Sequence, residues 1–232
     1  MSEKIISTKS NLQVLHEDNH IIVINKRVGD LVQGDKTGDK PLSEIVKEYI
    51  KEKYNKPGEV FLGVVHRLDR PTTGIVVFAK TSKALTRLNE LFSKRETQKT
   101  YWAVVKNKPP KSEDTLVHYL KRNEKSNCSK AHLKEVPESK RASLDYKIIK
   151  ELNNYLALEI NLHTGRHHQI RSQLAAIGCP IKGDLKYGFD RSNPDGGIHL
   201  HAQKLAFIHP VSKEELVLLA PTPNEIIWNS IK

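Results

Sequence analysis

The chain has 232 residues, of which 38% are hydrophobic, so it can bury one sizeable core and a single domain is the expected organisation. Lys and Arg number 38 against 27 Asp and Glu, a formal net charge of +11 that favours a polyanion such as nucleic acid as the partner. No stretch is apolar enough to span a membrane or to act as a secretory segment, so we expect a cytoplasmic protein without membrane contact.

Apolar runs and amphipathic stretches follow one another in the first part of the chain. Residues 20–25, 59–65 and 74–80 each predict a short buried strand. Residues 41–54 place their apolar side chains on one helical face, and their initial proline suits a first helical turn. Residues 81–96 predict a second helix, which a Thr or Ser at its start caps.

The second part is richer in strands. Residues 142–152 and 155–162 predict a hairpin about an Asn-Asn pair, and residues 167–178 predict a helix that ends at a glycine. Further strands are predicted over residues 99–105, 197–209 and 214–220. Many strands and about three helices without regular alternation indicate an α+β fold.

Residues 107–141 differ from their surroundings. They carry nine Lys or Arg against five Asp or Glu and few large apolar side chains. We expect a mobile basic insertion rather than a second domain, and therefore one domain over residues 1–232 that contains this insertion.

One stretch comes close to a nucleotide-binding phosphate loop. In "GDLVQGDKT" (29–37), Asp35 separates Gly34 from Lys36, whereas the loop needs Gly-Lys-Thr without a break. Asp30 and Asp35 would also repel phosphate. We therefore expect a turn here, and no cofactor.

The stretch "GVVHRLDRPTTG" (63–74) ends an apolar run in a dense group of charges and then breaks at a proline. Asp69 follows a predicted strand, so its Cα is expected near the core, where an ionised carboxylate needs a cation or several hydrogen-bond donors. Taken alone, an Asp at this place is also typical of a solvated turn.

A second charged stretch, "LHTGRHHQIR" (162–171), can supply the cation. It also ends a strand, turns at a glycine and begins a helix. Its potential cations are Arg166, His167, His168 and Arg171. Arg171 borders the predicted buried face of the helix and could pair with Asp69 through two parallel hydrogen bonds. Cations at a helix start oppose the helix dipole, which favours an anion nearby.

Both stretches resemble signature blocks of the RluA-type pseudouridine synthase family. "HRLDRPTTG" resembles its HRLD signature, and "LHTGRHHQIR" resembles its L-x-T-G-R-x-H-Q-I-R block. Other blocks in family order are "VINKRVGDLVQ", "KTYWAVV" and "IHLHAQKLAFIHP" followed by "LVLLAPTP". The resemblance covers about residues 15–223. It implies a pseudouridine synthase-like fold, with a mixed, mainly antiparallel central sheet and flanking helices.

Four positions depart from the family pattern. Arg27 replaces the usual Pro and Asp30 an apolar residue, which puts the local shape of that turn in question. Thr73 stands where Ser is usual, and His167 where Thr is common. None of the four belongs to the presumed catalytic set. The resemblance implies a member without the separate N-terminal RNA-binding domain of many relatives.

The resemblance implies isomerisation of specific uridines to pseudouridine in structured RNA, by base flipping. Asp69 is expected to be the essential carboxylate, Tyr101 to stack on the detached uracil, and Arg171 to keep Asp69 ionised. Arg67 is expected to fill the gap left by the flipped base. The other residues expected to contact RNA are His66, Arg166, His168, Lys121 and Arg122.

Two other functions stay open. A non-catalytic RNA-binding or ribosome-assembly module could share the fold. A metal hydrolase is conceivable because His199 and His201 share a strand face, with His163, His167 and His168 elsewhere, but no matching carboxylate pattern accompanies them. We expect no metal, a monomer, and ribosomal or transfer RNA as the partner.

Overall fold

The computed structural model describes residues 5–231 and divides the chain into two compact units. Unit 1 holds the described residues up to Thr97 together with Ala202–Pro223. Unit 2 holds Gln98–His201 and the described residues from Asn224 onward. The single domain inferred from the sequence stays a prediction.

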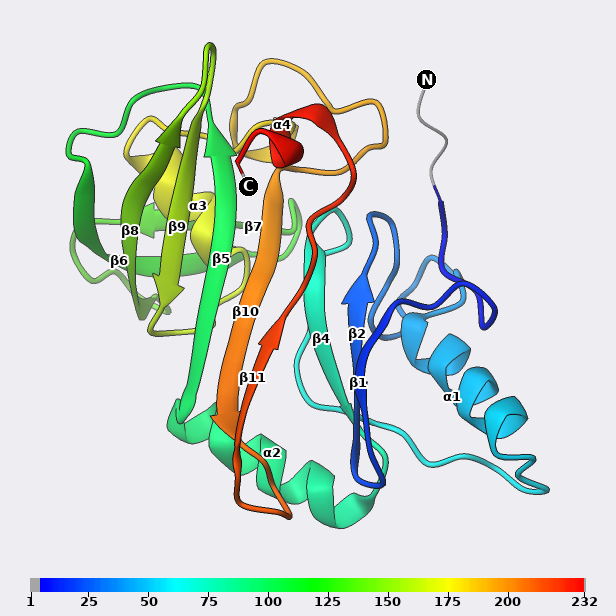
Figure 1. Ribbon diagram of the computed structural model, residues 1–232. Helices are drawn as coiled ribbons and strands as arrows, with labels where there is room; N and C mark the ends of the chain where they lie inside the picture. The colour runs from blue at the N-terminus through cyan, green and yellow to red at the C-terminus, as the bar shows by residue number, and fades with distance from the viewer. Residues whose placement is uncertain (1–4, 232) are drawn as a thin grey trace. The chain divides into compact units, whose positions relative to one another are not determined.

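Unit 1 combines a sheet with two helices. Its strands are β1 (Val14–Glu17), β2 (Ile21–Lys26), β3 (Gly63–Val64), β4 (Thr73–Ala79), most of β10 (Leu200–Ile208) and β11 (Glu215–Leu219), and its helices are α1 (Leu42–Lys53) and α2 (Ser82–Lys94) (Figure 1). The strand order is β1-β2-β4-β10, with β3 on β4 and β11 on β10. Helix α2 begins as predicted, because the Thr81 hydroxyl accepts the N–H of Ala84.

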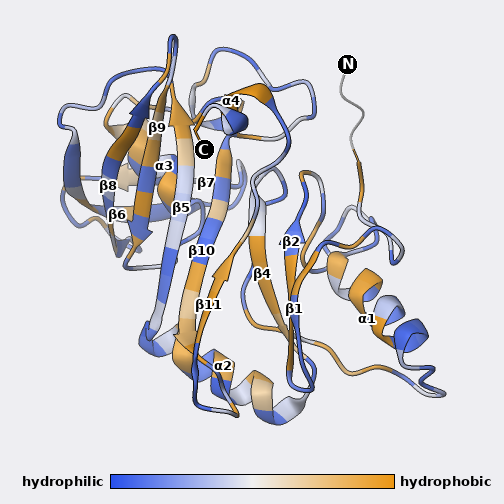
Figure 2. Ribbon diagram, in the orientation of Figure 1, coloured by the Kyte–Doolittle hydropathy of each residue, from blue (hydrophilic) through white to orange (hydrophobic). Residues whose placement is uncertain are grey.

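The core of unit 1 explains its two continuous apolar runs. Every residue of β2 and β4 is buried, and Figure 2 shows β4 as hydrophobic along most of its length. On one face of these strands Val23 belongs to a cluster with Leu88 of α2, and on the other Ile24 belongs to a cluster with Val46 of α1. Because both faces are covered, neither strand alternates between apolar and polar residues, and the polar Asn25 and Lys26 at the end of β2 are buried as well.

Unit 2 is an antiparallel sheet with a helix on one face. Its strands are β5 (Thr97–Val105, of which Thr97 lies in unit 1), β6 (Glu113–Asn123), β7 (Cys128–His132), β8 (Lys140–Glu151) and β9 (Leu156–Leu162), in the order β5-β9-β8-β6-β7. Every pair of neighbours in this order is antiparallel. Helix α3 (Gln169–Ala176) packs Ile170 and Leu174 on the sheet, and Trp228 of α4 (Ile226–Asn229) packs with Val104. The expected α+β fold is confirmed.

Two expectations about local structure are wrong. Residues 107–141 are not a mobile insertion, because they contain β6 and β7 and β6 pairs with β8. Alternate residues of β6, namely Leu116, His118 and Leu120, point into the core, so few apolar side chains suffice for a strand with one buried face. The strand predicted over residues 59–65 is limited to Gly63–Val64.

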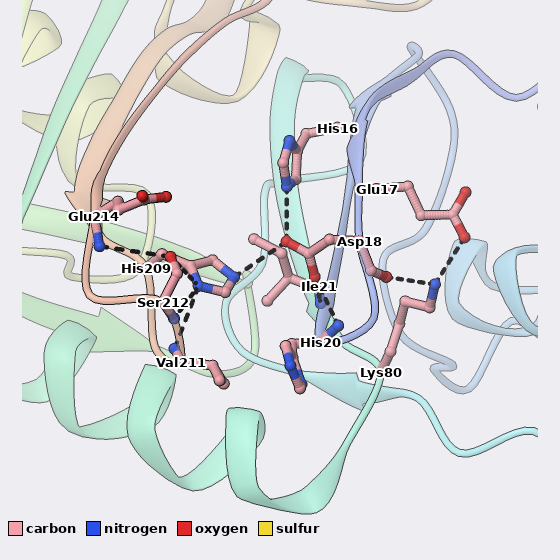
Figure 3. Close-up of polar contacts among 10 residues, drawn as sticks. All are labelled: His16, Glu17, Asp18, His20, Ile21, Lys80, His209, Val211, Ser212 and Glu214. Carbon is pink, nitrogen blue, oxygen red and sulfur yellow. Dashed lines mark hydrogen bonds and ion pairs between the residues drawn. The ribbon is translucent and has the colours of Figure 1, made fainter.

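A buried carboxylate, Glu17 at the end of β1, binds Lys53 of α1 and Lys80, which follows β4. Figure 3 shows the contact with Lys80. The Glu17 side chain is 6% exposed and accepts hydrogen bonds from Lys53 at 2.7 Å, Lys80 at 2.8 Å and the hydroxyl of Tyr54 at 3.0 Å. Burial alone would raise the pKa of Glu17, but these donors together lower the pKa from 4.5 to about 2.

We predict that Glu17→Gln lowers the free energy of unfolding at neutral pH by about 3 kcal/mol, because it leaves the buried ammonium of Lys80 without its carboxylate. The pKa of Glu17 is lower in the folded state, so its charge stabilises the fold above the unfolded pKa of about 4.3, and this stabilisation is lost as the pH falls toward 2. Urea unfolding of both proteins at neutral pH and at about pH 3 measures the effect.

The difference between wild type and Glu17→Gln should shrink at the lower pH. Glu48→Gln, which removes the exposed partner of Lys40, is the matched control and should cost less than about 1 kcal/mol. A difference that does not change with pH would contradict the assignment of the low pKa to Glu17.

Candidate functional site

The first charged stretch, residues 63–74, runs from β3 to β4 within unit 1. His66 is fixed from two sides: its Nε2 accepts the N–H of Val77 at 3.1 Å, and its ring stacks on Phe92 with centroids 4.7 Å apart. Arg67 is exposed and Asp69 is half-buried. The side chain of Arg67 is thus accessible to solvent, whereas Nε2 of His66 supports the loop.

A buried ammonium holds the backbone around Asp69. Lys26, at the end of β2, is 1% exposed, and its Nζ donates to the carbonyl oxygens of Arg27 at 2.9 Å, Arg70 at 3.0 Å and Thr72 at 2.7 Å. The N–H of Thr72 in turn donates to the carbonyl of Asp69 at 3.0 Å. A cation that shares its three protons among carbonyls fixes the chain on the C-terminal side of Asp69.

Two of the departures from the family pattern compensate each other. Arg27, unlike a proline, carries a backbone N–H, and the buried carboxylate of Asp30 accepts it at 3.2 Å. Asp30 also accepts the N–H of Ser7 at 3.1 Å and its hydroxyl at 2.6 Å. The new donor at position 27 therefore has an acceptor at position 30, and the turn keeps its hydrogen bonds satisfied.

The glycine that ends the first stretch has no room for a side chain. Gly74 has φ +110°, and a Cβ built on it would lie 2.4 Å from the carbonyl oxygen of Ala202 in β10. Only glycine combines this backbone conformation with so close a neighbour. The motif therefore ends in Gly because β4 and β10 meet there.

Polar side chains fix the second stretch in unit 2 before its helix begins. The Thr164 hydroxyl accepts the N–H of Ser143 at 2.9 Å and donates to Oε1 of Gln169 at 2.7 Å. Gln169 Nε2 donates back to the Ser143 carbonyl at 3.1 Å, and its Oε1 accepts the N–H of Arg166 at 3.0 Å. Thr164 and Gln169 are each 3% exposed, so these bonds lie in the protein interior and set the direction of α3.

Arg171, in the first turn of α3, has a carboxylate partner that the sequence analysis missed. Its Nε donates to Oδ2 of Asp184 at 2.7 Å and its Nη2 donates to Oδ1 at 2.8 Å. The two side chains are 4% and 1% exposed. The Tyr187 ring lies under the guanidinium, with Cζ 5.0 Å from the ring centroid. The sequence marks a turn here, since Gly183 and Gly188 bracket Asp184 and Tyr187, but it does not indicate that this turn reaches Arg171.

The remaining predicted residues lie on different parts of unit 2. Tyr101 is half-buried on β5 and packs against the cluster under α3. His168 is 9% exposed, and its Nδ1 hydrogen-bonds the Tyr187 hydroxyl at 2.9 Å. On β6, Lys121 pairs with Glu138 at 2.9 Å, and Arg122 is exposed. His168 therefore contributes to the support of Arg171, while Lys121 and Arg122 face the solvent.

The predicted catalytic residues are divided between the units. Asp69 belongs to unit 1, and Tyr101 and Arg171 belong to unit 2. The pairing of Asp69 with Arg171 stays a prediction. Arg166, which lies three residues before α3, donates from Nε to the carbonyl of Arg141 at 3.2 Å.

The histidines proposed as an alternative metal site have other partners. His199 uses Nδ1 with Asn193 at 2.9 Å and Nε2 with Glu225 at 3.1 Å, and its ring stacks on Trp228. His163 pairs with Asp145 at 2.8 Å. Within residues 5–231, no group of three or more His, Cys, Asp or Glu is placed to hold a metal ion.

A pocket of about 350 Å³ in unit 1 brings Asp18, His209 and Ser212 together (Figure 3). His209 lies 3.1 Å from Asp18 through Nε2 and 3.0 Å from the Ser212 hydroxyl through Nδ1, an order of groups seen in hydrolases. However, Nδ1 also accepts the backbone N–H groups of Val211 at 3.3 Å and Ser212 at 3.0 Å. His209 therefore stabilises the turn between β10 and β11, and its occupied lone pair is a poor base for Ser212.

Comparison with known proteins places the chain in a family. A family model described as RNA pseudouridylate synthase matches residues 20–176, which include both charged stretches. The chain therefore belongs to the RNA pseudouridylate synthase family, in its RluA-type branch, whose members are isomerases. Among the described residues, the helices are all too short or too polar to cross a membrane.

Similar proteins agree with this placement. The ribosomal large subunit pseudouridine synthase D of Vibrio cholerae is 34% identical over 236 residues, covering 93% of this chain and 69% of the relative. The tRNA pseudouridine synthase C of Vibrio parahaemolyticus is 28% identical, covering 90% of this chain and 89% of the relative. The solved structure of human RNA Pseudouridylate Synthase Domain Containing 4 shares the fold, with a TM-score of 0.77 at 24% identity over 93% of this chain and 90% of that one.

We predict that Lys26→Met lowers the free energy of unfolding by about 3 kcal/mol, because it removes the donor that three carbonyl groups share. The amides of Thr72 and Gly29, which are bonded to the carbonyls of Asp69 and Arg70, should exchange with deuterium faster. Urea unfolding and hydrogen exchange measure the two effects. Lys51→Met, at an exposed site on α1, is the control; equal stability of the two variants would refute the role given to Lys26.

Proposed function

We propose that this chain flips a uridine out of structured ribosomal or transfer RNA and isomerises it to pseudouridine, with Asp69 as the essential carboxylate. The family match over residues 20–176 carries the proposal, because that region contains Asp69, Tyr101 and Arg171 in the blocks where the family has its active site. A monomeric, cytoplasmic enzyme is part of the proposal.

The chemistry accounts for the choice of residues. The bond between the ribose C1′ and N1 of uracil breaks, the base turns, and a bond forms between C1′ and C5. C5 loses a proton and N1 gains one, so atoms and electrons balance without a cofactor. A carboxylate such as Asp69 can stabilise positive charge on the sugar, take the 2′ proton, or attack as a nucleophile. All three roles require Asp69 to be ionised.

The other residues serve the flipped base. Tyr101 stacks on the detached uracil, so that the base stays in place while it turns. Arg67, which is exposed, enters the space that the uridine leaves in the RNA. Unstacking costs a few kcal/mol, which these contacts must supply together with the phosphate contacts. In this proposal Arg171 is the cation for Asp69, while Asp184 holds the guanidinium through Nε and Nη2.

We predict that Asp69→Asn abolishes pseudouridine formation and changes RNA affinity by less than about twofold, because Asn keeps the shape but not the negative charge. Single-turnover assays with tRNA and rRNA substrates measure formation, and filter binding measures affinity. Asp39→Asn is the matched control, because its carboxylate pairs with Arg70, next to Asp69, and is exposed. Turnover by homogeneous Asp69→Asn protein would exclude the catalytic role. An inactive wild type that still binds RNA would favour a non-catalytic module.

A second prediction concerns the contacts of the β6–β7 hairpin with RNA phosphates. Lys121, Arg122 and Lys125 are on or beside the tip of the β6–β7 hairpin, and the last two are exposed. Replacing all three with Ala should weaken RNA binding and reduce the slope of log affinity against log salt by roughly 2–3, since each phosphate contact contributes roughly 0.7–0.9. The chemical step at saturating RNA should change little.

The measurement is affinity across a salt series. Replacing Lys36, Lys51 and Lys56 of unit 1, which are also exposed, removes the same charge and is the control. If both triple variants reduce the slope equally, the hairpin has no special role, and net charge alone explains binding.

A further inference from the structure

The short turn after α3 brings two residues to Arg171 at once. Asp184 precedes the 3-10 turn η1 (Leu185–Tyr187), and Tyr187 ends it. Residues three apart in such a turn lie one above the other, so both side chains reach the same guanidinium. Gly183 at φ +89° and Gly188 at φ +93° give the turn its sharp ends.

The two contacts restrain the guanidinium in different ways. Asp184 holds one edge of the group through Nε and Nη2, which fixes its direction within the plane. The Tyr187 ring packs beside the cation, with Cζ of Arg171 5.0 Å from the ring centroid, a distance typical of a cation–π contact. Both residues lie in unit 2 with Arg171, so this support does not depend on unit 1.

Tyr187 also reaches a strand far from it in sequence. Its hydroxyl accepts the backbone N–H of Ser129, on β7, at 2.8 Å and hydrogen-bonds Nδ1 of His168 at 2.9 Å. Burial raises the pKa of Tyr187 to about 12, so the phenol stays protonated at neutral pH. It can therefore accept the Ser129 bond and donate its own proton to His168 simultaneously.

Ser129 attaches the β6–β7 hairpin to the residues before α3 through its side chain, in addition to the bond of its backbone N–H to Tyr187. Its hydroxyl lies 2.8 Å from the carbonyl oxygen and 2.9 Å from Nδ1 of His167, which is next to His168 and stacks on it. Ser129 is 5% exposed, so this attachment is buried. The β6–β7 hairpin, which carries Lys121 and Arg122, is thereby joined to the residues that begin α3.

We propose that Tyr187 is a positioning residue that orients Arg171 and couples this orientation to the β6–β7 hairpin. The inference rests on the proposed function, in which Arg171 serves the chemistry and the hairpin binds RNA. Its consequence is that a phosphate contact on the hairpin is transmitted to the active-site arginine through one phenol hydroxyl and one serine.

The test compares Tyr187→Phe with Tyr146→Phe. Tyr146 is buried in unit 2, and its hydroxyl donates to the carbonyl of Lys111 at 3.2 Å. Both variants keep the ring; Tyr146→Phe loses this one phenol hydrogen bond, whereas Tyr187→Phe loses the two to Ser129 and His168. Tyr187→Phe should lower the single-turnover rate at saturating RNA by about 10- to 100-fold, the range expected for a misplaced catalytic group. Tyr146→Phe should leave this rate within about twofold, whatever both variants do to the melting temperature.

Coupling is tested with Ser129→Ala and the double variant. Ser129→Ala keeps the backbone N–H that Tyr187 accepts and removes only the hydroxyl that bonds His167. If both attachments of the hairpin act on Arg171 as one unit, Ser129→Ala slows the chemical step, and the double variant is no slower than Tyr187→Phe alone. If the rate reduction of the double variant equals the product of the two single reductions, the coupling is refuted. If Tyr187→Phe has the same rate as the wild type, the positioning role is refuted. Faster deuterium exchange of the Ser129 amide in Tyr187→Phe is expected independently of activity. An inactive wild type would instead refute the proposed function, which keeps the two failures apart.

Discussion

The buried ammonium of Lys26 is the constraint on which the first motif depends. A lysine that is 1% exposed must have its charge compensated, and here three backbone carbonyls do this. Two of these carbonyls, of Arg70 and Thr72, belong to the residues that follow Asp69. These bonds attach strand β2 to the loop that precedes β4, so the buried end of β2 determines where the backbone next to Asp69 lies.

The second motif is supported by a different kind of bond with the same result. Thr164 and Gln169 are uncharged and buried, and their side chains bind the backbone of Ser143 in β8. The sheet of unit 2 thus sets the start of α3 before Arg171 is reached. In both units, the blocks that resemble the family contain two kinds of residue. Some are expected to carry out the chemistry, and others fix the backbone that carries them.

The sequence predicted those parts of the fold that follow from periodic burial. Continuous apolar runs marked β2 and β4, and one-sided helical patterns marked α1 and α2, because burial of whole faces leaves a repeated signal. Strand β6 gave no such signal, since His118 takes one of its inward positions and the apolar Val117 lies on its other, exposed face. The partner of Arg171 could not be deduced, because Asp184 is 13 residues away and is brought close by a turn rather than by a helical or strand period.

The departures from the family pattern show why single positions are a weak guide to local shape. Arg27 and Asp30 each look disruptive alone, yet the added N–H of one is accepted by the carboxylate of the other. The same carboxylate binds Ser7, so the substitution also attaches the segment that leads into the unit. Asp30 would keep its two bonds to Ser7 without the N–H of Arg27, whereas that N–H would lose this acceptor without Asp30.

Two ion pairs in unit 2 differ in burial, and therefore in the free energy needed to break them. The Arg171–Asp184 pair has side chains that are 4% and 1% exposed, and breaking a buried pair of this kind costs about 3–5 kcal/mol. The Lys121–Glu138 pair is 43% and 80% exposed, and such pairs are worth about 0–1 kcal/mol. Lys121 can therefore exchange Glu138 for a phosphate at little cost, while Arg171 keeps its orientation. The proposed function needs this difference, because it requires the protein to release and rebind RNA while Arg171 keeps its orientation, and the difference in exposure provides it.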